Sequence, residues 1–208
     1  MRKGTNVLKM GFAALLVLGV ANPLHAQITG TDHDFSGDTW NPSGQICIVC
    51  HTPHNGDTLV VGAPLWNHEV TLASHTPYSS STLDATVGAP SGTSKLCLSC
   101  HDGTVALDNF GGTTTGTNFI GGLADFGTDL SNDHPISFVY DAALATADGG
   151  LQDPTTQSSG LGGTITGDLL FAGSLECGSC HDVHDNTVAP FLRKSNAASA
   201  LCLTCHAK

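Results

Sequence analysis

The stretch CIVCH at residues 47–51 decides the fold of this chain, because the sequence repeats its pattern. Cys-x-x-Cys-His returns as CLSCH at 97–101, CGSCH at 177–181 and CLTCH at 202–206. These four copies use all eight cysteines, so no cysteine is left for another purpose. We therefore treat the repeated pattern as the feature around which the remaining sequence is organised.

This spacing is the attachment signature of c-type haem. Two thiols three positions apart can form thioethers with the two vinyl groups of one porphyrin, and the following histidine can then bind the iron. We predict four c-type haems with iron, attached through Cys47, Cys50, Cys97, Cys100, Cys177, Cys180, Cys202 and Cys205. The predicted proximal iron ligands are His51, His101, His181 and His206.

Other uses of paired cysteines explain the pattern less well. A zinc site takes four ligands but does not require a histidine after every second cysteine. A thioredoxin-like redox motif would occur once, and a disulfide framework has no use for the fixed histidine.

The first 26 residues have the features of a secretory signal peptide. Basic residues precede an apolar run at 10–20, and the sequence NPLHA ends at Ala26, where we expect cleavage. This run is too short to span a bilayer, and no cysteine stands at the expected cleavage point to carry a lipid anchor. We expect export to the extracellular space or cell surface, with the periplasm as the alternative, and no membrane span.

The mature chain is acidic and poor in material for a conventional core. Residues 27–208 keep four of the seven basic residues and all 18 acidic ones, so the formal charge falls from −11 to −14. This charge argues against nucleic acid or an anionic membrane as a partner. Since only 6% of residues are aromatic, we expect porphyrins to supply much of the buried surface, and an apoprotein that does not fold.

Histidine is the expected sixth ligand of each iron. The only methionines, Met1 and Met10, leave with the signal peptide, and bis-His ligation favours a low potential. The predicted distal ligands are His33, His54, His134 and His184, with His68 and His75 as alternatives.

We expect a fold that is mostly coil, with a few short helices, wrapped around a chain of four haems. One helix should span 95–101 after a capping serine or threonine at 91–94, and another 197–206 after Asn196. The Gly- and Thr-rich stretches 110–129 and 141–166 are predicted mainly as surface loops, with short β-hairpins as an alternative. A single domain at 27–208 would contain two dihaem units, about 27–110 and 130–208.

These motifs resemble those of multihaem c-type cytochromes with doubled CxxCH motifs. More closely, the chain resembles extracellular tetrahaem cytochromes that polymerise into conductive filaments, or nanowires. The resemblance implies bis-His ligation and one haem per subunit whose distal histidine comes from the adjacent subunit, with His54 as the expected donor. The matching stretches are 33–35, 47–55, 64–68, 96–106, 132–137 and 177–192.

The leading functional hypothesis is electron transfer as a filament subunit. Its partners would be copies of itself, redox partner cytochromes and extracellular electron acceptors such as metal oxides. A soluble periplasmic tetrahaem shuttle ranks lower, because docking on acidic partners favours lysines and only Lys95, Lys194 and Lys208 survive processing. A multihaem redox enzyme would need an iron with an open position, whereas six histidines are available for four distal positions. We therefore expect no enzyme activity.

Overall fold

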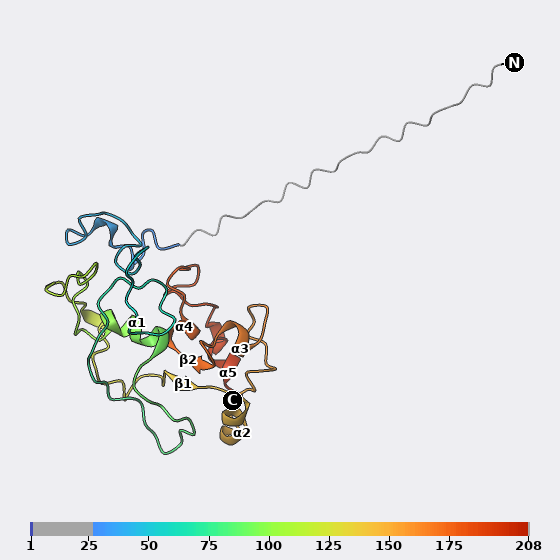
Figure 1. The fold of residues 1–208 in the computed structure, drawn as a ribbon. Coiled ribbons are helices and arrows are strands. Elements are labelled where there is room, and N and C mark those ends of the chain that lie inside the picture. The colour runs from blue at the N-terminus through green and yellow to red at the C-terminus, as the bar shows by residue number, and fades with distance from the viewer. Residues whose placement is uncertain (2–26, 208) are drawn as a thin grey trace.

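The structure is a computed structural model that describes Met1 and residues 27–207, so the predicted signal peptide and Lys208 lie outside the described residues. Most of the described chain is coil, with a few short helices and one two-stranded sheet (Figure 1). This confirms the expected mostly coil fold. The elements are η1 (Phe35–Gly37), α1 (Gly92–His101), η2 (Gly122–Ala124), β1 (Phe138–Val139), α2 (Ala142–Asp148), α3 (Ile165–Asp168), β2 (Ser174–Leu175), α4 (Cys177–Cys180), η3 (Ala197–Ser199) and α5 (Cys202–Cys205).

The haem-attachment motifs form single helical turns. The second motif ends α1, the third forms α4 and the fourth forms α5. The first motif is a turn in which the His51 amide donates to the Cys47 carbonyl at 2.8 Å. Because residues three apart lie on one side of a helical turn, each motif can present both of its thiols to one ligand.

Helix α1 confirms the helix expected over the second motif. It begins at Gly92, with Ser91 as its N-cap residue, and it buries Leu96 and Leu98. It packs against α4, which brings the second and third motifs together although a long stretch of sequence separates them (Figure 1).

The stretch 141–166, which we predicted to be mainly surface loop, contains helix α2 and the start of helix α3. Asp141 caps α2 by accepting a hydrogen bond from the Leu144 amide, and Gly149 ends the helix with a φ of 67°. The alanines between them favour helix. At the far end, Ile165 is fully buried at the start of α3. The loop prediction holds for most of the stretch and is wrong at α2 and at the start of α3, where local capping and one buried side chain outweigh the glycine content.

The predicted helix over 197–206 is also wrong in extent. The structure divides this stretch into η3 and α5, because Ala198 has left-handed backbone angles, with φ 50° and ψ 36°. The Asn196 side chain accepts a hydrogen bond from the Leu201 amide rather than capping a continuous helix.

Two clusters of buried apolar residues lie outside the haem-attachment motifs. The larger one gathers around the β1–β2 sheet, where Phe138 lies opposite Leu175. It is formed by Phe138, Tyr140, Ala145, Ile165, Leu169 and Leu175. The smaller cluster contains Val60, Trp66, Val70 and Leu96. The chain thus has more core of its own than its composition indicated, while the unfolded apoprotein stays a prediction.

The other Gly- and Thr-rich stretch, 110–129, is mostly coil with η2 as its one helical turn, and none of its described residues belongs to a strand. In the described part of the chain, none of the helices has the length and apolar character that crossing a membrane requires.

Candidate haem-binding sites

Three of the four predicted proximal histidines are oriented by backbone carbonyls. Nδ1 of His51 lies 2.7 Å from the Pro64 oxygen, and Nδ1 of His101 lies 2.7 Å from the Ala124 oxygen. His181 repeats the arrangement with the Pro190 oxygen at 3.0 Å. A carbonyl accepts only from a protonated nitrogen, so Nδ1 carries the proton and Nε2 keeps its lone pair for a metal.

Three of the proximal histidines have a second histidine opposite them. The ring centroids are 6.0 Å apart for His33 and His101 and 6.0 Å apart for His51 and His184. For His134 and His206 the separation is 6.4 Å. These pairs join each proximal residue to a histidine from the predicted distal set.

The separations match two axial ligands on one metal ion. A histidine nitrogen binds a first-row metal at about 2 Å, which places two opposed imidazole centroids roughly 6 Å apart. All three pairs have this spacing. The residues therefore fit the iron of a covalently attached haem, with the CxxCH thiols beside one member of each pair. The assignment of individual ligands stays a prediction.

His181 and His54 are the remaining proximal and distal candidates. Within the described residues, no histidine ring is paired with His181, whose neighbour His184 faces His51 instead. His54 is exposed, and its only hydrogen bonds in the structure are made by its backbone, to Thr52. One predicted distal histidine thus points to solvent while one proximal histidine has no internal partner.

The two alternative distal histidines have other contacts. Both ring nitrogens of buried His68 lie within 3.0 Å of carbonyls, those of Glu69 and Ala106. His75 Nε2 lies 3.1 Å from a carboxylate oxygen of Asp102. Neither ring is paired with a predicted proximal histidine among the described residues, whereas those of His33, His134 and His184 are.

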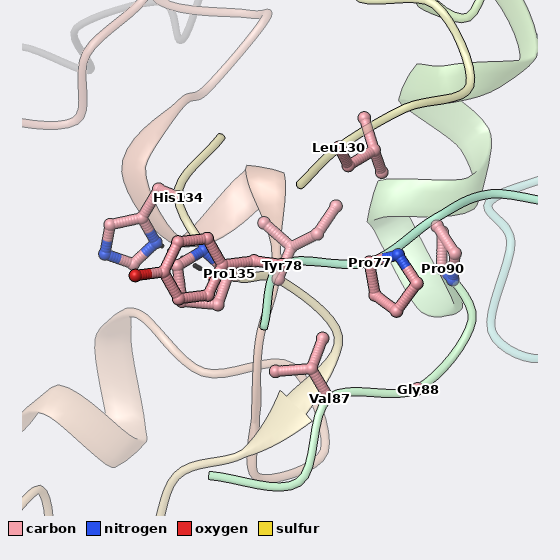
Figure 2. Close-up of a pocket in the computed structure, with 9 residues that line it drawn as sticks. Pro77, Tyr78, Val87, Gly88, Pro90, Leu130, His134 and Pro135 are labelled. Carbon is pink, nitrogen blue, oxygen red and sulfur yellow. Dashed lines mark hydrogen bonds between the residues drawn. The ribbon is translucent and has the colours of Figure 1, made fainter. Parts of the chain in front are cut away.

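His134 lies at the edge of a small pocket shown in Figure 2. Its Nδ1 is 2.8 Å from the carbonyl oxygen of Pro135, the residue that restrains His134 to an extended backbone. Figure 2 shows the Tyr78 ring beside the imidazole. The other pocket walls are mainly proline and aliphatic side chains, from Pro77, Val87, Pro90, Leu130 and Ile136.

The interactions between cysteines indicate which of the four motifs lie next to one another. A hydrogen bond with Cys177, together with burial, raises the pKa of Cys97, and the same hydrogen bond lowers the pKa of Cys177 against the effect of burial. Burial, together with the nearby Cys50 thiolate, raises the pKa of Cys100. Burial and the nearby Cys180 raise the pKa of Cys205 to about 11. Such charge effects need proximity, so successive motifs are neighbours: first with second, second with third, third with fourth.

Helices α1 and α4 meet closely at the second and third motifs. The Cys177 amide donates to Ser94 Oγ at 2.9 Å. A Cβ at Gly178 would lie 2.9 Å from the Phe171 ring and 3.0 Å from Thr93 Oγ1. Arg193 Nε donates to the Gly178 carbonyl at 2.6 Å. The glycine between the two cysteines therefore allows this approach.

Comparison with known families agrees with this geometry. A family model described as "Doubled CXXCH motif" matches residues 171–208. The chain carries a doubled CxxCH motif. The motif implies covalently bound c-type haem and is consistent with a multihaem c-type cytochrome involved in electron transfer. None of the curated proteins compared with the chain matches it.

The contacts between motifs could not be read from the sequence. No local signal marks Pro64, Ala124 or Pro190 as the carbonyls that orient the proximal rings. A further residue that the sequence reasoning missed is Glu176, a buried carboxylate directly before the third motif. Its one sequence signal is the spacing to Ser179, with which it forms a capping box.

Proposed function

We propose that this protein transfers electrons through four bis-His c-type haems as the subunit of an extracellular conductive filament. Neighbouring motifs in space would hold successive haems near one another, so electrons would pass from haem to haem along the chain. Export to the cell exterior, delivery to external acceptors such as metal oxides, and the lack of enzyme activity belong to the same proposal.

The unmatched histidines carry the filament proposal. Three proximal histidines have a partner at 6.0–6.4 Å within the chain. His181 then lacks a distal ligand, while His54 is exposed and its ring has no partner in the described structure. We propose that His54 of one copy binds the iron held by His181 of the next. A single such exchange is head-to-tail, and head-to-tail contacts that do not close into a ring generate filaments.

The sequence resemblance to the filament-forming tetrahaem cytochrome OmcE supports the same arrangement. With four internal ligand pairs, the chain would instead suit a soluble periplasmic shuttle. The described residues contain three such histidine pairs, which favours a filament subunit over a diffusible electron carrier.

The test is cryo-electron microscopy of the purified extracellular holoprotein. We expect filaments with an unbroken row of haems and His54 on the iron of the adjacent subunit. The variant His54→Ala should give discrete particles, whereas Thr58→Ala, a substitution of an exposed residue in the same segment, should still polymerise. Wild-type particles with four internally ligated irons would refute the filament and leave a diffusible electron carrier.

A further inference from the structure

Glu176 is a buried carboxylate at the contact between the second and third motifs. Its exposed fraction is 2%, and it directly precedes Cys177 at the start of α4. On the other side it faces the start of α1, where a Cβ at Gly92 would lie 3.1 Å from Oε1. The carboxylate therefore lies between the helices that carry the second and third haem-attachment motifs.

The groups around this carboxylate are hydrogen-bond donors. Ser137 Oγ donates to Oε2 at 2.8 Å, and Ser91 Oγ lies 3.5 Å from Oε1. The backbone amide of Glu176 donates to Ser179 Oγ at 2.9 Å, which fixes the start of α4 beside the carboxylate. Hydroxyl donors of this kind favour the ionised form of a carboxylate.

The Glu176 carboxylate has no basic side chain beside it. Among residues 27–207, no lysine or arginine nitrogen lies within 4.0 Å of a Glu176 oxygen. Arg193 donates a hydrogen bond to the Gly178 carbonyl instead. Lys194 donates to the Ser159 carbonyl and to the Thr204 hydroxyl. A buried charge without a counterion is costly, and this prompts the question of what balances it.

We propose that Glu176 is a redox-tuning residue whose negative charge favours the ferric state of the haems on the second and third motifs. A ferric c-type haem carries one more positive charge at its core than a ferrous one. An adjacent fixed anion therefore stabilises the oxidised form and lowers the reduction potential, since local charge and burial set haem potentials. The ferric haems would in turn supply the missing countercharge.

The proposal rests on the proposed electron-transfer function but not on filament assembly. It gives the middle of the internal haem row a lower potential than the same haems would have beside a neutral residue. The charge would therefore make an electron less stable on the second and third haems than it would be beside a neutral residue.

The test is an anaerobic spectroscopic redox titration of the purified holoprotein. We expect Glu176→Gln to move two of the one-electron steps to higher potential, each by about tenfold in the reduction equilibrium, or about 59 mV. Glu176→Asp keeps the charge and should titrate like the wild type. Asp141→Asn is the control, because it removes one negative charge from the exposed N-cap of α2, which accepts a hydrogen bond from the Leu144 amide at 2.8 Å.

A second variant keeps the test decisive if Glu176→Gln fails to load haem. Ser91 is exposed and adjacent to Oε1, so Ser91→Lys would place a cation beside the intact carboxylate. It should raise the same two steps, whereas Ser91→Ala should not. Unchanged steps in Ser91→Lys and Glu176→Gln would overturn the proposal, as would equal shifts in Glu176→Asp and Glu176→Gln. Absence of any reversible haem couple in the wild type would instead overturn the electron-transfer function.

Discussion

Removal of His184 should open one iron, and only one, to an external ligand. Its ring centroid lies 6.0 Å from that of His51, with 18° between the ring planes. In His184→Ala the haem of the first motif loses its distal ligand, while the His33–His101 and His134–His206 pairs are untouched. Since the chain has four motifs, a quarter of the haem should become high-spin.

Carbon monoxide measures this change directly, because it binds a ferrous haem only where a coordination position is open. Titration of the dithionite-reduced variant should give one more carbon monoxide bound per chain than titration of the wild type in the same assembly state. The high-spin fraction in the absorption spectrum of the oxidised protein provides an independent measure of the same quarter.

The control is His68→Ala, which removes a histidine whose two ring nitrogens lie against the Glu69 and Ala106 carbonyls. This variant should bind no extra carbon monoxide. If His184→Ala binds none either, or if His68→Ala binds one, the pairing argument from ring separations is refuted.

Three further predictions concern the protein scaffold. Gly178→Ala would place a methyl group 2.9 Å from the Phe171 ring and should cost about 1–3 kcal/mol, measured by thermal unfolding; Gly121→Ala, which has open space around it, should melt like the wild type. Ile165→Ala empties a fully buried position and should cost about 2–5 kcal/mol, and an unchanged melting temperature would show that the larger apolar cluster contributes little. Burial lowers the pKa of His68 below 6.5, so the unfolded chain binds the proton first as the pH falls. The stability contribution is therefore complete above about pH 6.5 and is lost below it, and His68→Asn should flatten this acid slope in denaturant titrations.

The sequence allowed the local features of the haem sites to be predicted, because they depend on neighbours in the chain. The Cys-x-x-Cys-His turns, the helix that ends at His101 and the restraint of His134 by Pro135 all arise within a few residues. The helix predicted over 197–206 failed at Ala198, whose left-handed conformation no local signal marks. Asp141 and Gly149, by contrast, were readable capping signals within a stretch whose glycine content dominated the interpretation.

The partners across each iron could not be predicted, because they depend on the tertiary path of the chain. His184 lies three residues after His181, yet it faces His51. The predicted two dihaem units thus share a ligand pair, and their division stays a prediction. Glu176 was likewise invisible, because its environment is built by Ser91 and Ser137, which come from distant segments.

The contact between His51 and His184 can form only late in the folding of the protein. Its members lie near opposite ends of the mature chain, so this contact closes a very long loop and belongs to the slow class of folding events. During the proposed export, the first motif would emerge and could receive its haem long before residue 184 arrives. Any nascent or truncated chain that lacks His184 would carry a reactive, five-coordinate iron on its first motif. Binding of His184 to that iron would occur only in the complete chain.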